Sequence, residues 1–285
     1  MTISIITVAY HSEKVMPYFL ASIERIRSMT DEKIELLIRD NTDDNIGLSR
    51  AVNLLLGKAA GELILFSNPD VTFGTSFFDM VSLVRQTGMP ATPAYIRHDV
   101  DRRMPTFTRI VFASTITAGF MKRRGLNPIE RDYDRVGQVV EQPGGSFLLM
   151  PRTTVNLLAE YGMFYDERFP VFYNDVDLAM RARQKGVRFL KASKCRVYHK
   201  GAHSTEDMDT ERRLQLIYGP CGLAGFAKKW REMHLNLLRL FFFLDAVLWT
   251  LIGVVAFFVG RRSRFNTRIL RNSQRGLVTF RCLIQ

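Results

Sequence analysis

Three polar motifs in this sequence combine side chains and a position suited to group-transfer chemistry. Asp70 follows an apolar run, and a carboxylate at the end of a buried strand can hold a divalent cation against a diphosphate. Asp175 and Asp177 stand at the start of a predicted helix, where one can cap the helix and the other can act as a general base toward a hydroxyl group. His199 and His203 stand four residues apart, and one of them can supply a metal ligand. Each has an ordinary alternative explanation: a turn, a helix N-cap or an exposed loop.

The pair Asp40-Asn41 also follows an apolar run. The carboxylate of Asp40 can accept a hydrogen bond from the N–H of a pyrimidine base. An Asx turn that leaves the strand is the alternative explanation for the same two residues.

Alternating apolar runs and helical patterns determine where these residues lie. Residues 3–9, 34–39 and 62–67 are typical of buried strands, and helical patterns stand between them, the first up to about residue 27 and the second over 49–60. This β-α-β-α-β order predicts a parallel sheet with helices on both faces. Polar residues follow all three strands, at the edge where open α/β sheets bind their ligands.

The second part of the chain is more broken. Residues 144–150 predict a strand and 175–185 a helix, followed by short strands over 188–190 and 196–199. The basic stretch before them contains one apolar run, 110–121, followed by three basic residues. The segment 110–124 suits either a second membrane contact or an amphipathic core helix.

The C-terminal part predicts contact with a membrane. Residues 240–259 are twenty residues with one charge, Asp245, and the last 25 residues contain seven arginines and no acid. Because Asp245 interrupts the run and basic residues flank both of its ends, we expect peripheral or monotopic attachment, with the arginines on anionic headgroups. A buried core helix is the alternative.

Composition excludes several classes of protein. The chain has 285 residues, a net charge of +12 and 47% hydrophobic residues, which argues against a disordered protein. The positive charge adjoins an apolar run rather than interleaved aromatic residues, so we expect no nucleic-acid partner. No GxGxxG motif follows the first strand, which disfavours a dinucleotide-dependent oxidoreductase.

The order and spacing of these motifs resemble the family 2 inverting glycosyltransferases, in particular their rhamnosyltransferase-like branch. The matching segments are SIITVAYHS (4–12), IRDNTDDNIGLSRAVNLLL (38–56), GELILFSNPDV (61–71), GGSFLLMPR (144–152) and the segment 162–204 with its FYNDVDL and YH motifs.

This resemblance implies a GT-A-type α/β fold with a mixed, mainly parallel sheet flanked by helices. The catalytic domain would cover residues 1–204, with a nucleotide-sugar half in about 1–96 and an acceptor half in about 97–204. A helical, basic, membrane-associating region would follow in 205–285.

The resemblance also implies roles for single residues. Asp175 would be the catalytic base, and Asp70 with His199 would bind Mg²⁺ or Mn²⁺. The residues expected to bind the nucleotide sugar are Thr7, Ala9, Tyr10, Asp40, Asn41, Asn45, Gly47, Asn68, Asp70 and Gly145. Two positions depart from the family pattern, because the metal triplet keeps only one carboxylate and Asn174 replaces the usual acid before the base.

The implied function is transfer of a sugar, best L-rhamnose from dTDP-rhamnose, to a polyprenyl-diphosphate-linked saccharide. Such an enzyme would build an O-antigen-like polysaccharide of the lipopolysaccharide type at the cytoplasmic face of the inner membrane. Galactofuranose or galactose, carried on UDP, are alternative donor sugars. The two departures leave open a non-catalytic scaffold in a polysaccharide assembly complex.

Overall fold

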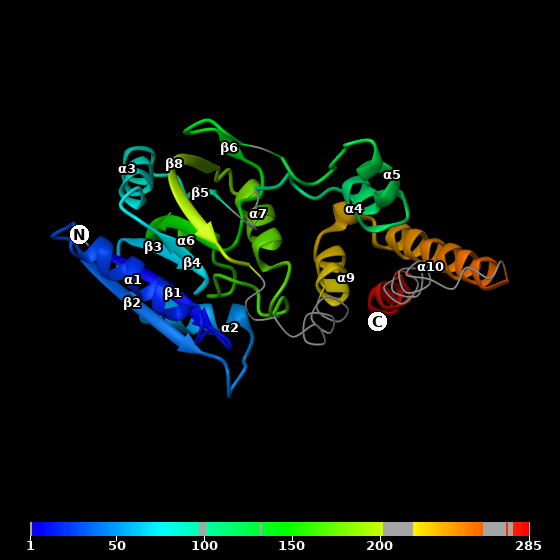
Figure 1. Ribbon diagram of the computed structural model, residues 1–285, viewed down its shortest axis with the longest axis horizontal. Helices are drawn as coiled ribbons and strands as arrows, with labels where there is room; N and C mark the ends of the chain where they lie inside the picture. Colours follow the sequence, from blue (N-terminus) through cyan, green and yellow to red (C-terminus); the bar gives the residue numbers. More distant parts are fainter. Residues whose placement is uncertain are drawn as a thin grey trace. The chain divides into compact units, whose positions relative to one another are not determined.

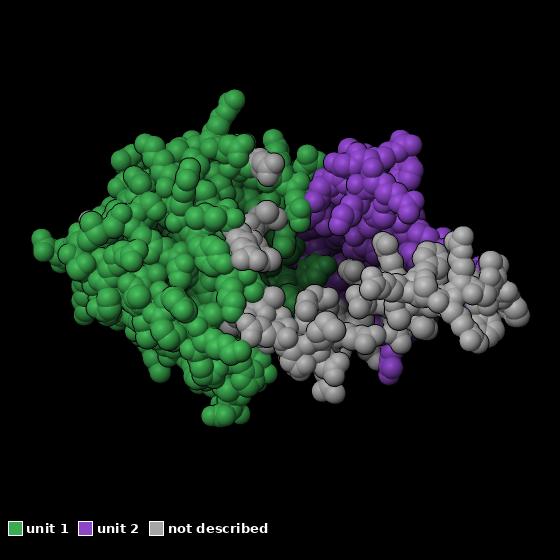
Figure 2. All heavy atoms as spheres, in the orientation of Figure 1, with its two compact units in different colours: residues 1–104, 130–208 green, residues 105–129, 209–285 purple. Residues whose placement is uncertain are grey.

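The computed structural model describes residues 2–96, 101–131, 133–201, 219–258, 272 and 276–284. The chain divides into two compact units (Figure 2). The α/β unit consists of Met1–Met104 and Glu130–Met208, and the helical unit of Pro105–Ile129 and Asp209–Gln285.

A mixed sheet forms the centre of the α/β unit (Figure 1). Its strands are β1 (Thr2–Ala9), β2 (Lys33–Asp40), β3 (Leu63–Ser67), β4 (Val71–Phe73), β5 (Ala91–Tyr95), β6 (Val139–Val140), β7 (Phe147–Pro151) and β8 (Phe189–His199). The strand order is β2-β1-β3-β7-β5-β8-β4, and β6 pairs with β8. Pairing is parallel between β1 and β2, β1 and β3, and β5 and β8, and antiparallel elsewhere.

Helices cover both faces of this sheet. They are α1 (Met16–Arg27), α2 (Leu48–Leu56), α3 (Phe77–Thr87), α6 (Arg152–Leu158) and α7 (Asn174–Gln184). The core cluster joins apolar residues of α1 and α3 to alternate residues of the strands, such as Ile3 and Ile5 of β1. Because successive strand residues point to opposite faces, the residues between them pack toward α2 and α6, which contact β1, β3 and β7. The predicted α/β class with parallel ladders flanked by helices is confirmed.

Two predicted strands differ from the observed ones. Gly144 and Gly145 lie in the turn before β7 rather than inside a strand. The two short strands predicted over 188–199 are one strand, β8, whose register against β5 shifts between Pro93 and Ala94. Proline has no N–H to donate, so the ladder is interrupted on β5 while β8 continues.

The helical unit contains α4 (Phe107–Ser114), α5 (Thr117–Arg123), α9 (Gly219–Lys229), the 3₁₀ helix η3 (Arg231–Met233) and α10 (Leu235–Phe258), and residues 276–284 are also helical. The ring of Phe107 lies 5.7 Å from the rings of His234 and Phe241, measured between centroids. The segment 105–129 therefore belongs to this unit, whereas the sequence predicts that it belongs to the acceptor half.

The predicted apolar run is helical through residue 258, and it begins five residues earlier than expected, at Leu235. The helix from Arg231 to Val255 is long and apolar enough to cross a membrane, judged by length and composition only. Asp245 is buried, and its carboxylate accepts a hydrogen bond of 2.6 Å from the backbone N–H of Ile116. Val259 and all arginines of the tail except Arg281 lie outside the described residues.

The close approach of two strands at Gly61 leads to a stability prediction. A Cβ atom at Gly61 would lie 2.5 Å from the backbone nitrogen of Ser4, so Gly61→Ala must push β1 and β3 apart. We expect the free energy of unfolding to fall by about 1–3 kcal/mol, measured by urea denaturation. Gly57→Ala is the control, since its nearest atom lies at 3.6 Å, and it should change stability by less than about 0.5 kcal/mol. Equal effects of the two substitutions would contradict the prediction.

Candidate functional site

The strand ends that carry the polar motifs meet at one edge of the sheet. The carboxyl ends of β1, β2 and β3 lie together because these strands are parallel. Ser67 at the end of β3 pairs with Phe147 at the start of β7, and Val71 at the start of β4 pairs with His199 at the end of β8. We call this edge the carboxyl edge.

Asp70 and His199 are in direct contact at the carboxyl edge. The Nε2 atom of His199 lies 3.2 Å from Oδ1 of Asp70, and both residues are buried. The backbone N–H of Gly201 donates to Oδ2 of Asp70 over 3.0 Å, and that of Lys200 donates to its carbonyl oxygen over 3.1 Å. Residues 129 positions apart in the sequence are thus held together by the pairing of β4 with β8.

The donor atoms of this pair fit a divalent cation. In an octahedral site, two neighbouring ligands at about 2.1 Å from the ion are about 3 Å apart, close to the observed separation of the Asp70 oxygen and the His199 nitrogen. Among the described residues no group of three or more His, Cys, Asp or Glu side chains could hold a metal ion. An ion bound at this pair would therefore take its remaining ligands from water or phosphate oxygens.

The two acids at the start of α7 have different surroundings. Asp177 is fully buried and forms an ion pair of 2.9 Å with Arg181, which also donates to the carbonyl of Phe164 over 2.8 Å. Asp175 is partly exposed, and its Oδ1 accepts from the backbone N–H of Val176 over 2.9 Å. Asp177 therefore anchors the helix, while Asp175 is accessible to a ligand.

Asp175 lies against the glycine turn before β7. A Cβ atom at Gly145 would be 3.2 Å from Cβ and 3.6 Å from Oδ2 of Asp175. The next residue, Ser146, accepts a hydrogen bond of 2.8 Å at its carbonyl from the backbone N–H of Asn68. A continuous series of contacts thus leads from Asp175 through the turn to Asn68, two residues before Asp70.

The start of α7 is tied to the start of α2. The amide of Asn174 donates to Oγ of Ser49 over 3.3 Å, and that hydroxyl donates to the carbonyl of Phe169. Since the only hydroxyl proton of Ser49 is already used, a carboxylate at position 174 would have no proton to accept there. The departure at Asn174 therefore has a structural explanation: its buried amide positions the neighbouring Asp175.

The loop between β2 and α2 is ordered by its own polar groups. Asn41 is buried; its backbone N–H donates to the carbonyl of Ala9 over 2.8 Å, and its side-chain amide donates to the carbonyl of Gly47 over 3.3 Å. The backbone N–H of Gly47 donates to the side chain of Asn45 over 3.0 Å. Gly47 has a φ of +83° and lies against Pro170, two reasons why a glycine is required there.

The remaining predicted residues lie at the same edge. The hydroxyl of Thr7 donates to the carbonyl of Ser67, and Tyr10 is half-buried just after β1. Asp40 is exposed and forms the expected Asx turn, accepting from the backbone N–H of Thr42 over 2.8 Å. Hydrogen bonds from the hydroxyl and the backbone N–H of Thr42 hold the pKa of Asp40 below its usual value, so its carboxylate is ionised at neutral pH.

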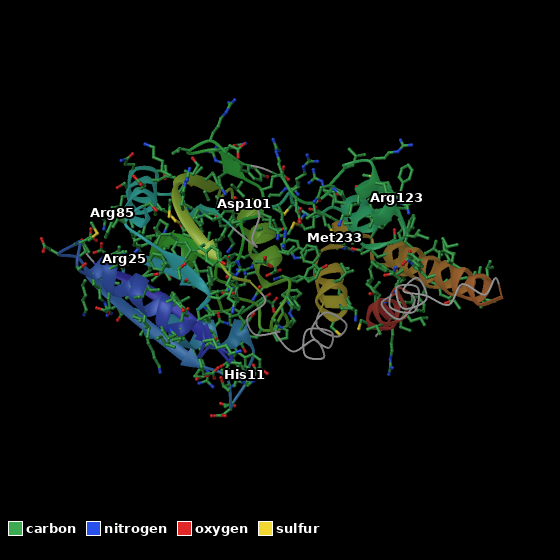
Figure 3. The ribbon with its side chains drawn as sticks, viewed as in Figure 1. His11, Arg25, Arg85, Asp101, Arg123 and Met233 are labelled. Atoms are coloured by element: carbon green, nitrogen blue, oxygen red, sulfur yellow. The ribbon has the colours of Figure 1, made fainter. Side chains whose placement is uncertain are left out.

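A buried clamp behind the glycine turn has no counterpart among the predicted residues. The backbone N–H of Gly144 donates to Oδ1 of Asp101 over 3.2 Å, and its carbonyl accepts from the hydroxyl of Tyr95 over 3.2 Å (Figure 3 labels Asp101). Lys191 approaches Oδ2 of Asp101 to 2.5 Å and also donates to the carbonyl of Pro93. In the sequence, an isolated Asp and an isolated Lys look like exposed residues, so only their three-dimensional proximity reveals the pair.

No protein-family model and no curated protein matches this chain. Among solved structures it is similar to S. aureus TarS, with 15% identity and a TM-score of 0.42, over 79% of this chain and 43% of TarS. It is also similar to TarS 1–349 in complex with UDP, with 16% identity and a TM-score of 0.42, over 99% of this chain and 89% of that one. A third is glucosyl-3-phosphoglycerate synthase from Mycobacterium tuberculosis in complex with Mn²⁺, UDP and phosphoglyceric acid, with 13% identity and a TM-score of 0.49, over 80% and 78% of the two chains.

These values are too low to carry a function from those proteins to this chain. The chain spans 43% of the length of TarS, which leaves more than half of that protein without a counterpart here. The residues at the carboxyl edge therefore provide the evidence for the function of this chain.

The buried pair of Asp101 and Lys191 leads to a second prediction. Burial raises the pKa of Asp101, and the ammonium of Lys191 opposes that rise. Lys191→Met would leave a buried, uncompensated carboxylate, and we expect a loss of about 3–5 kcal/mol in the free energy of unfolding at pH 7.

The pH dependence provides a check. In Lys191→Met the folded state would hold the Asp101 proton more tightly than the unfolded state, so stability should fall as the pH rises from 5 to 7. The double variant Lys191→Met/Asp101→Asn removes the buried charge and should be more stable than the single variant at pH 7. Urea denaturation at both pH values measures the free energy of unfolding. The prediction is wrong if the stability of Lys191→Met is the same at pH 5 and pH 7.

Proposed function

We propose that this protein is an inverting glycosyltransferase that moves a sugar from a nucleoside diphosphate to a hydroxyl group. The observation that supports it best is the shared edge of the sheet, where the contacting pair of Asp70 and His199 is linked through Asn68 and the glycine turn to Asp175. Ligands for a diphosphate-bound cation and an accessible carboxylate are the two groups that this reaction requires.

The nucleotide would lie along the ends of β1 and β2. The ionised carboxylate of Asp40 can accept the N–H of a pyrimidine base, beside Thr7, Ala9 and Tyr10. The ordered loop formed by Asn41, Asn45 and Gly47 would shape the pocket for the nucleotide.

Asp175 would act as the general base. It would take the proton of the acceptor hydroxyl while the hydroxyl oxygen forms a bond to the anomeric carbon. The bond from that carbon to the diphosphate oxygen would break, and its electron pair would leave with the nucleoside diphosphate. Attack opposite the leaving group inverts the anomeric centre. A divalent cation, Mg²⁺ or Mn²⁺ held by Asp70 and His199, would stabilise the negative charge of the departing diphosphate.

The donor we propose first is dTDP-L-rhamnose, and the acceptor is a polyprenyl-diphosphate-linked saccharide of an O-antigen-like polysaccharide. The similarity of the motifs in 38–71 and 162–204 to the rhamnosyltransferase-like branch supports this choice. Galactofuranose or galactose from a UDP-linked donor are the alternatives. A non-catalytic scaffold is less well supported, because Asn174 has a structural role and the base next to it is retained.

We propose that the protein acts at the cytoplasmic face of the inner membrane, attached peripherally or monotopically. Most of the surface of α10 is apolar and exposed, while its one acid, Asp245, is buried and hydrogen-bonded to Ile116. The exposed large apolar side chains of α10 are Leu237, Leu240, Phe241, Phe243, Leu244, Val247, Leu248, Leu251, Val254 and Val255. Such a surface is suited to lipid contact.

The base assignment predicts the effect of Asp175→Asn. The amide keeps the size of the side chain but cannot take a proton, so sugar transfer should fall at least about a hundredfold. Transfer would be measured from dTDP-rhamnose and from UDP-sugars to a lipid-linked acceptor, and donor affinity should change little. Asp31→Asn, at an exposed position between α1 and β2, is the control. Undiminished transfer by Asp175→Asn would remove this residue from the base role.

The metal assignment predicts that donor binding depends on Asp70. Calorimetry with dTDP or UDP should show tighter binding when Mn²⁺ is present, and Asp70→Ala should abolish that gain. His199→Gln should weaken it in part, because one ligand remains. Nucleotide binding that is indifferent to Mn²⁺ in the unmodified protein would contradict the assignment.

The membrane assignment predicts that negative charges on α10 release the protein from the membrane. Leu244→Glu/Leu251→Glu places two negative charges on its exposed face and should lower binding to anionic vesicles at least about tenfold in a flotation assay. Leu20→Glu, at an exposed leucine of α1, should bind like the unmodified protein. Unchanged flotation of the α10 variant would show that another surface makes the contact.

A further inference from the structure

We propose that a cavity within the helical unit binds the diphosphate and the first isoprenoid units of the lipid-linked acceptor. This inference rests on the proposed function and assigns a site to one of its substrates. The cavity has a volume of about 830 Å³ and lies between residues of α4, α5 and α10, together with Asn272 and Gly276.

Apolar side chains form much of the wall of this cavity. They come from two separate parts of the chain, with Ile116 and Phe120 on one side and Phe242, Trp249 and Ile252 of α10 on the other. Burial of a hydrocarbon chain against such a wall is favourable.

Among the described residues that line the cavity, two are cations. Lys122 and Arg123 are exposed at the end of α5 and belong to its lining (Figure 3 labels Arg123). Asp245 is the one acid among the described lining residues, and its carboxylate accepts the N–H of Ile116 at the start of α5. The described part of the lining thus combines a net positive charge with an apolar wall, which matches a diphosphate attached to a hydrocarbon chain.

The position of the cavity beside α10 favours a lipid over a protein partner. The same helix that supplies Phe242, Trp249 and Ile252 to the wall exposes apolar residues such as Leu244 and Leu248 elsewhere on its surface. A ligand that reaches the cavity from a membrane would therefore stay in contact with apolar surface along its path.

Gly119 provides a way to fill the cavity without disturbing the backbone. It lines the cavity, and a Cβ atom added to it would meet no atom within 4 Å. Gly119→Ala should therefore be tolerated and should favour the helix, whereas Gly119→Trp would place an indole in the open space.

The test measures binding of a fluorescent polyprenyl diphosphate to the full-length protein in phosphatidylcholine nanodiscs. Gly119→Trp and the double variant Lys122→Gln/Arg123→Gln should each raise the Kd at least about tenfold. Gly119→Ala should bind within about twofold of the unmodified protein. Arg124→Gln should do the same, because Arg124 is the next cation in the sequence but stacks on the ring of Phe120 and is not part of the lining.

Three outcomes would overturn the proposal. Equal binding by all variants would place the lipid elsewhere, and equally strong competition by phosphatidylglycerol would make the site a general headgroup site. Absence of binding by the unmodified protein would indicate that the chain itself or a second copy occupies the cavity. Hydrolysis of the nucleotide sugar, measured in parallel, does not require the cavity. Absence of this hydrolysis would count against the proposed function. The lipid-binding results of the variants test only the proposed lipid site.

Discussion

The antiparallel pairing of β4 with β8 is the constraint on which the candidate site depends. It sets Val71 opposite His199, and thereby brings the imidazole to 3.2 Å from the carboxylate of Asp70. Both groups are buried, so their separation is determined by the backbone ladder rather than by flexible side chains. A site built in this way is organised before a ligand arrives, which lowers the entropic cost of binding a cation or a phosphate.

Buried polar groups elsewhere in the α/β unit also hold the site in position before a ligand binds. The clamp of Asp101 and Tyr95 holds both backbone polar groups of Gly144, next to the glycine that contacts Asp175. The hydrogen bond from Asn174 to Ser49 ties the start of α7 to α2. Each group would be costly to bury alone, so each must keep its partner, and this requirement leaves the turn and the helix start few alternative positions.

The helical unit accommodates a charged residue, Asp245, in the middle of the apolar helix α10. A carboxylate in the middle of an apolar helix would be expensive on a lipid-exposed face, yet Asp245 is buried and accepts the N–H of Ile116 at the start of α5. The remaining large side chains of α10 can then be apolar and exposed. The proposed attachment to a membrane and the internal packing of this unit would therefore use different faces of one helix.

The sequence by itself determined the type and order of most elements, because apolar runs and helical periodicity are local properties. It also placed Asp70, Asp175 and the residues after β1 and β2 near the ends of strands or helices. It did not reveal that β8 is one strand, since its polar middle residues look like a loop, nor that 105–129 joins the helical unit. The Asp101–Lys191 pair, the role of Asn174 and the partner of Asp245 were decided only by tertiary structure. Each of them depends on residues between 90 and 129 positions apart whose contact no local pattern encodes, because burial and hydrogen-bond partners arise only when separate elements pack together.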